Sequence, residues 1–281
     1  MTLPPVGYVR PRTLAEALTA LAGEGARPLA GGQTLVPALA ARLIPAPRTL
    51  VDLAAVPGLD VLEGTADGGL RIGAMVRQRA AERSELVAGR APMLAEALAE
   101  VGHPSVRHRG TVVGSVAHAD PAAELPAVAV ALGAVAEVAG ADGRRDVAVS
   151  ALVACGPRAG EVIVALRLPA PAPGEGQAWL ETAPRRFDLP VASAGARCVP
   201  GDGGPVVAGL VLGGVGPTPV DVGDAVRRLR PGSAELASAL DAAAARLDPP
   251  SDARGSAQLR RHLARTLAER AIARAAERTA A

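Results

Sequence analysis

The sequence predicts an α+β fold built from two domains. Its 281 residues exceed the roughly 100–200 residues of a typical domain, and segments typical of strands alternate with segments typical of helices. The stretch richest in proline and glycine, residues 168–177, is the best linker candidate. We therefore expect domains at 1–170 and 176–281, the first with subdomains of about 1–55 and 56–170, because short strand-like segments dominate after residue 58.

The first elements have clear local signals. Thr13-x-x-Glu16 is a capping box, and it predicts a helix whose apolar positions recur until Gly23. Residues 26–31 are expected to form a strand that ends in Gly31-Gly32, and residues 33–43 a following helix. Residues 49–56 are the next expected strand.

The middle of the chain is predicted to contain a strand at 69–76 and a helix at 92–101. Residues 110–116, "GTVVGSV", are interpreted as strand and loop. Asp120-Pro121 supplies an N-cap and a first-turn proline for a helix ending at about Gly133.

In the second domain, "PGDGG" joins two strand-like segments and predicts a hairpin. Three helices are expected after it, near 222–229, over 233–247 and from Ser256. In the last helix an apolar residue recurs every fourth position from Leu259, so its arginines, Arg260 included, are expected to form a solvated face.

Composition excludes several functions. The formal net charge is +2, and the basic residues are spread along the chain, so no nucleic-acid partner is expected. No apolar run approaches the roughly 18 residues of a membrane span, and the N-terminus shows no secretory signal, which favours the cytoplasm. Cys155 and Cys198 are too few for an iron–sulfur cluster, and we expect no metal site and no catalytic triad in this chain.

The glycine pair Gly31-Gly32 has two possible interpretations. Unpaired N–H groups before a helix attract anions, and glycine lets a phosphate approach closely, but such pairs often form simple turns. A second glycine-containing segment, 109–115, favours the phosphate interpretation, because two loops can hold a pyrophosphate from both sides. Two separated loops suggest a dinucleotide.

Several segments together resemble one known family. "LAGGQTLVPALAARL", "LRIGAMVR" and "VRHRGTVVGSVAHADPAAELPAVAVALGA" are similar to the FAD-binding medium subunits of molybdenum hydroxylases, which include aerobic carbon monoxide dehydrogenases and xanthine dehydrogenases. The resemblance implies two α/β subdomains that hold FAD between them, followed by a small domain of antiparallel sheet and helices. It also implies an iron–sulfur small subunit and a molybdenum-cofactor large subunit as partners.

The resemblance further implies which residues touch FAD. One segment would bind the pyrophosphate through its backbone and a second would face it; Glu124 would accept a hydrogen bond from a sugar hydroxyl, and Ile163 would pack near the adenine or the flavin ring. An alternative for Glu124 is a carboxylate favoured by a helix dipole. The expected cofactor-binding residues are Ala30, Gly31, Gly32, Gln33, Thr34, Thr111, Val113, Gly114, Ser115, Glu124 and Ile163.

Val113 and Glu181 depart from the family pattern in ways that bear on FAD. Val113 replaces a glycine of the second loop; its β-branched side chain disfavours positive φ and adds bulk, so either the backbone is extended there or FAD binding is weakened. Glu181 stands where the family often has lysine, and a carboxylate there disfavours an anionic reduced flavin.

The expected function is therefore electron transfer from a partner's [2Fe–2S] cluster through FAD to an external acceptor. One alternative is the same fold with a lost or repurposed flavin site, acting as a scaffold or a stand-alone enzyme. Another is a flavin reductase of the cell-wall precursor type, although its motifs are missing here. The cofactor in such a protein supplies the chemistry and the chain supplies binding and orientation.

Overall fold

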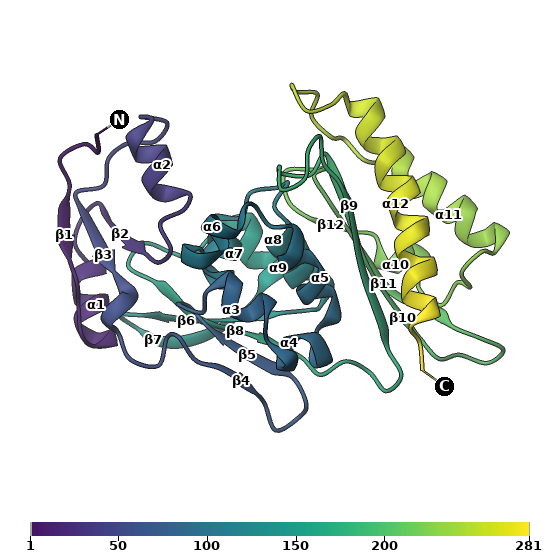
Figure 1. The fold of residues 1–281 in the computed structure, drawn as a ribbon, viewed down its shortest axis with the longest axis horizontal. Coiled ribbons are helices and arrows are strands. Elements are labelled where there is room, and N and C mark those ends of the chain that lie inside the picture. The colour runs from purple at the N-terminus through teal and green to yellow at the C-terminus, as the bar shows by residue number, and fades with distance from the viewer. Residues whose placement is uncertain (1, 281) are drawn as a thin grey trace.

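The computed structural model describes residues 2–280 and confirms the mixed α and β fold. Three sheets follow one another along the long axis, with helices between and outside them (Figure 1). The N-terminal unit is small, the middle unit is the largest, and the C-terminal sheet carries its long helices on the outer side. None of the helices within residues 2–280 combines the length and hydrophobicity needed to cross a membrane.

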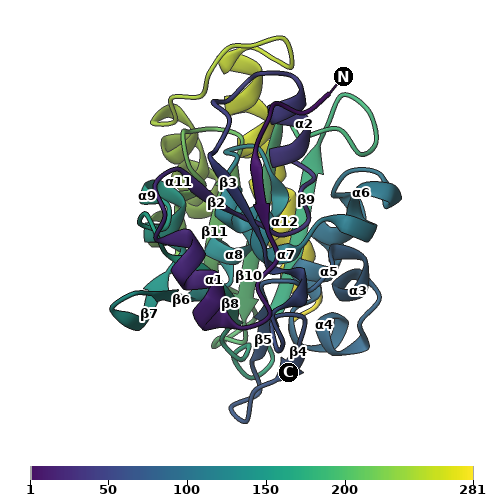
Figure 2. The ribbon, with the colours of Figure 1, turned by 90° about the vertical axis from the view of Figure 1, so that its left-hand side faces the viewer.

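The N-terminal unit is a parallel three-stranded sheet in the order β1-β3-β2. Its elements are β1 (Gly7–Val9), α1 (Leu14–Leu21), β2 (Ala26–Leu29), α2 (Leu35–Ala40), β3 (Thr49–Asp52) and the short helix η1 (Leu53–Ala55). The capping box is confirmed: Thr13 Oγ1 accepts from Glu16 N–H at 3.1 Å, and Glu16 Oε2 accepts from Arg12 N–H at 2.7 Å. In Figure 2 this unit faces the viewer, and its strands lie in front of the middle unit.

The middle unit is an antiparallel sheet in the order β4-β5-β8-β6-β7 with helices packed on one side (Figure 1). Its strands are β4 (Leu62–Gly64), β5 (Leu70–Gly73), β6 (Val135–Gly140), β7 (Gly143–Ala148) and β8 (Val162–Leu168). Its helices are α3 (Gln78–Glu82), α4 (Glu85–Arg90), α5 (Pro92–Glu100), α6 (Pro104–Arg109), α7 (Val112–His118), α8 (Glu124–Ala131) and α9 (Val149–Cys155).

Two sequence predictions in this unit are wrong. Residues 110–116 are not strand and loop, because residues 112–118 form helix α7, whose valines pack into the core while Thr111 caps its N-terminus. The next helix begins at Glu124 with Ala123 as N-cap, not at Asp120. Asp120 instead uses its carboxylate to accept from Ala122 N–H at 2.8 Å, a local turn that delays the helix.

The C-terminal unit is an antiparallel sheet in the order β12-β11-β10-β9. The predicted hairpin and the three helices are present. The elements are β9 (Gly176–Thr182), β10 (Ala192–Val199), β11 (Val206–Gly213), β12 (Val220–Asp221), α10 (Gly223–Val226), α11 (Ala234–Ala245) and α12 (Ala257–Glu277). One face of the sheet packs on α12, and its other face, which includes Trp179 and Val211, joins the core of the middle unit.

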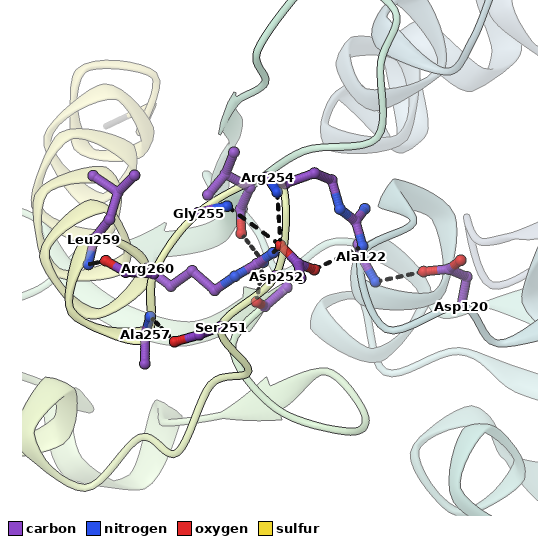
Figure 3. Close-up of polar contacts among 12 residues, drawn as sticks. Asp120, Ala122, Ser251, Asp252, Arg254, Gly255, Ala257, Leu259 and Arg260 are labelled. Carbon is purple, nitrogen blue, oxygen red and sulfur yellow. Dashed lines mark hydrogen bonds and ion pairs between the residues drawn. The ribbon is translucent and has the colours of Figure 1, made fainter.

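The prediction that Arg260 lies on a solvated face of α12 is wrong, because Arg260 is only 1% exposed. Its Nη1 donates to the carbonyl oxygens of Val191 (2.6 Å) and Gly214 (2.8 Å), and its Nη2 donates to Asp252 Oδ1 at 2.8 Å. Figure 3 shows this side chain running from α12 to Asp252, with Asp120 of the middle unit across from it. Small alanines on the same side of α12 let the helix approach the sheet, whereas Leu259 is 42% exposed.

Candidate functional site

The first glycine segment, Ala30–Thr34, is the turn between β2 and α2. Gly32 has φ +70°, a left-handed conformation that favours glycine. Gly31 is required for a different reason: a Cβ there would lie 2.7 Å from Gly110 Cα and would also collide with the carbonyl oxygen of Arg109. Gln33 Nε2 donates to the carbonyl oxygen of Gly31 at 3.2 Å and braces the turn.

This turn leaves a run of backbone donors free. Among the hydrogen bonds within residues 2–280, none has the N–H of Gly31, Gly32, Gln33 or Thr34 as donor, while Val36 N–H already bonds to Gly32 O at 3.0 Å. Successive unpaired N–H groups in a turn form a concave donor set for an anion. The turn thus presents unpaired backbone N–H groups where the resemblance implies a contact with the pyrophosphate, and that contact stays a prediction.

The second glycine segment, Thr111–Ser115, is the first turn of α7 rather than a loop. Thr111 Oγ1 accepts from Gly114 N–H at 3.0 Å, and Ser115 N–H bonds to Thr111 O at 3.2 Å. Val113 is 3% exposed and its side chain belongs to the core, so it adds no bulk at the surface. Its backbone is helical and has no positive φ. The expected extended backbone is therefore wrong, and the effect of this valine on FAD binding stays a prediction.

The two glycine segments lie against each other. Gly31 touches the backbone of Arg109 and Gly110 just before α7, and a Cβ on Gly114 would lie 3.9 Å from Ala30 Cβ. The first segment, with its unpaired N–H groups, therefore lies beside the start of α7. This geometry fits a pyrophosphate, since it combines unpaired N–H groups with glycines that leave room for close approach.

Two predicted residues lie outside this pair of segments. Glu124 begins α8 and is 2% exposed; burial, with the nearby charges of Glu181, Asp120 and Glu100 adding to it, raises its pKa to about 8. Ile163 lies in β8 opposite Val138, is 4% exposed, and is part of the hydrophobic core.

Arg77 is a residue that the sequence reasoning missed. Its Nη1 donates to the carbonyl oxygen of Arg109 and so fixes the backbone against which Gly31 packs. Burial, and the charge of Arg109 next to it, lower the pKa of Arg77. No motif marks this arginine; only the closeness of Arg77 to Thr111 across an isolated bridge reveals it. Arg107, in contrast, is 4% exposed, and its Nε donates to Glu82 Oε2 at 2.8 Å. This buried arginine therefore connects α6 to α3.

Comparisons with known proteins cover nearly the whole chain. Residues 4–171 match the FAD binding domain in molybdopterin dehydrogenase, and residues 178–275 match the CO dehydrogenase flavoprotein C-terminal domain. The chain is 36% identical to the 6-hydroxypseudooxynicotine dehydrogenase complex subunit alpha of Paenarthrobacter nicotinovorans, over 99% of this chain and 97% of that one. It is 35% identical to the carbon monoxide dehydrogenase medium chain of Afipia carboxidovorans, over 96% of each.

Solved structures agree with these sequence matches. The carbon monoxide dehydrogenase of Hydrogenophaga pseudoflava that lacks the Mo-pyranopterin moiety superimposes with a TM-score of 0.94 at 30% identity, over 100% of both chains. Quinoline 2-oxidoreductase from Pseudomonas putida 86 gives a TM-score of 0.91 at 35% identity, over 99% of both chains. The chain is therefore a medium subunit of the molybdenum hydroxylase family, an oxidoreductase subunit whose cofactor is FAD.

Proposed function

We propose that the two glycine segments hold the pyrophosphate of FAD. The observation that carries this proposal is the set of four unpaired N–H groups from Gly31 to Thr34, placed beside Gly110 and the first turn of α7. Backbone donors and a left-handed glycine suit a doubly charged pyrophosphate, and Arg77 and Arg109 add positive charge nearby.

Within the same proposal, Glu124 accepts from a sugar hydroxyl of FAD, and Thr111, Val113, Gly114 and Ser115 contribute the second wall. Thr111 and Gly114 shape that wall through their mutual hydrogen bond, and Val113 offers its backbone N–H while its side chain anchors α7. The contact of Ile163 with the adenine or the flavin ring stays a prediction. FAD, when bound, supplies reversible redox chemistry, while the chain supplies binding and orientation.

We further propose that the chain is the electron-transfer subunit of a molybdenum-hydroxylase complex. It would receive electrons from a [2Fe–2S] small subunit and pass them to an external acceptor, while a molybdenum-cofactor large subunit oxidises the substrate. The support is the family and the cysteine count: two cysteines are too few to hold a [2Fe–2S] cluster by four thiolates. The domain limits 1–170 and 176–281 and the cytoplasmic location stay predictions.

Purification of the tagged chain from its own host tests this function. We expect a yellow protein that releases one FAD per chain on denaturation and carries iron and molybdenum in fixed proportion. FAD without co-purifying metals would contradict the assignment of partners. A colourless protein that cannot be reconstituted with FAD would contradict the proposed site itself.

A further inference from the structure

Arg77 is held beside the second glycine segment by its own backbone. It is directly opposite Thr111 in an isolated antiparallel bridge, and the next residue, Gln78, donates its N–H to the carbonyl oxygen of Gly110 at 2.9 Å. Residues directly opposite each other in an antiparallel pair have their side chains on the same face. The side chain of Arg77 therefore leaves the backbone on the same side as that of Thr111, which caps α7.

The guanidinium of Arg77 reaches the point where the two glycine segments touch. Its Nη1 donates to the carbonyl oxygen of Arg109, and a Cβ on Gly31 would collide with this same oxygen. Gly31 is also the first of the four residues whose N–H groups donate to no group within residues 2–280. Arg77 and the set of unpaired N–H groups therefore meet at one carbonyl group.

The remaining donors of Arg77 have no partner in the part of the chain that the structure describes: its Nε and Nη2 donate no hydrogen bond, and the guanidinium forms no ion pair with a carboxylate. Arg107 shows what such a set of donors can hold. Its Nη1 also donates to backbone carbonyl oxygens, those of Val101 and Gly102, while its Nε and Nη2 donate to the two carboxylate oxygens of Glu82 at 2.8 and 3.4 Å. Arg77 has the first half of this arrangement and lacks the anion.

The charges around Arg77 favour an additional anion. Burial and the charge of Arg109 lower the pKa of Arg77, and Asp52 acts in the opposite direction. The carboxylate of Asp52 already has other partners, because its Oδ2 accepts from the Tyr8 hydroxyl and lies 3.7 Å from Arg10 Nε. A partly buried cation with a second cation beside it gains from an anion at its unpaired edge.

We propose that Arg77 is a further FAD-binding residue of this chain: its Nη1 keeps the Arg109 carbonyl oxygen against Gly31, and its Nε and Nη2 donate to one phosphate group of FAD. The proposal rests on the proposed FAD site. Nε and Nη2 lie side by side in the plane of the guanidinium, so they match two oxygens of a phosphate as they match the two oxygens of a carboxylate. The side chain of Arg77 thus adds a charged contact to a site otherwise made of backbone N–H groups.

This contact differs from a purely structural role in one measurable way. A guanidinium that only holds the Arg109 carbonyl oxygen would change FAD affinity without changing how affinity depends on salt. A guanidinium that bonds to a phosphate makes part of the affinity a charge–charge interaction, which salt screens. The salt dependence of the Kd for FAD therefore separates the two roles.

FAD titration of the FAD-free protein at several salt concentrations tests the contact. We expect Arg77→Met to raise the Kd by about 10- to 100-fold at low salt and to make it less dependent on salt. Arg77→Lys keeps the charge but loses the paired donors, so it should show a smaller rise in Kd and the salt dependence of the wild type. Arg83→Met, at the exposed C-cap of the same helix α3, is the matched control and should follow the wild type.

Thermal unfolding without FAD checks that each variant folds. Equal Kd values for Arg77→Met and Arg83→Met would overturn the contact, and so would a weaker affinity with unchanged salt dependence. If Arg77→Met does not fold, a Kd of Arg77→Lys equal to that of the wild type would overturn it. In each of these cases the wild type still binds FAD, whereas absence of FAD binding in both the wild type and Arg83→Met would overturn the proposed FAD site itself.

Discussion

Gly31→Ala tests whether the two glycine segments must touch. The new Cβ would lie 2.7 Å from Gly110 Cα, about 0.7 Å short of ordinary van der Waals contact, and its neighbours are backbone atoms that cannot rotate away. The segments must therefore move apart by roughly this distance, and overpacking of this kind costs about 1–3 kcal/mol. We expect the Kd for FAD to rise by about 10- to 100-fold, since each 1.4 kcal/mol corresponds to a factor of ten.

The assay is titration of the FAD-free protein with FAD, followed by flavin fluorescence and combined with thermal unfolding. Gly89→Ala is the matched control, because a Cβ on Gly89 meets nothing within 4 Å and this glycine lies inside α4. It should leave FAD affinity unchanged and raise stability slightly, by about 0.5–1 kcal/mol. If Gly31→Ala binds FAD as tightly as the control does, the contact between the segments is not needed for the site.

Further predictions concern the core and the buried charges. Val113→Gly should lower the free energy of unfolding by about 3 kcal/mol in chemical denaturation without improving the Kd for FAD, because the valine fills the core. Arg260→Met should lower the free energy of unfolding by about 3 kcal/mol, because two buried carbonyl oxygens lose their hydrogen-bond donor. The control Arg270→Met, on the exposed side of α12, should leave the free energy of unfolding almost unchanged. Asp252, whose pKa the hydrogen bond from Arg260 lowers to about 2, should stabilise the wild type above pH 4, and this contribution should fade between pH 4 and pH 2. Burial raises the pKa of Glu124 from 4.5 to about 8 in the folded protein. The free energy of unfolding of the FAD-free protein should therefore fall as pH rises from 4.5 to 8, by up to about 5 kcal/mol. Glu124→Gln should remove this pH dependence.

Local signals explain what could be predicted from the sequence. The turn at Gly31-Gly32 and the hairpin between β10 and β11 were predicted because glycines at fixed positions determine a turn over a few residues. The capping box at Thr13 acts over a similar distance. The residues expected at the first glycine segment accordingly lie where the sequence placed them.

The sequence predictions were wrong where tertiary packing, and not local propensity, determines the structure. Val112 and Val113 favour a strand by propensity, yet the cap at Thr111 and burial against the core make them helical. Arg260 follows a solvated pattern, but its acceptors are carbonyls distant in the chain, which no periodicity reveals. Likewise, only the register of the C-terminal sheet places Glu181 of β9 directly opposite Ser193 of β10.

Hydrogen–deuterium exchange with and without FAD tests the central claim most directly. The N–H groups of Gly31, Gly32, Gln33 and Thr34 donate to no group within residues 2–280 of the free chain and should exchange rapidly. Saturating FAD should protect them, together with the N–H groups at the start of α7. If FAD binds at a 1:1 ratio and these amides exchange as rapidly as before, the pyrophosphate lies elsewhere and the account of the site is wrong.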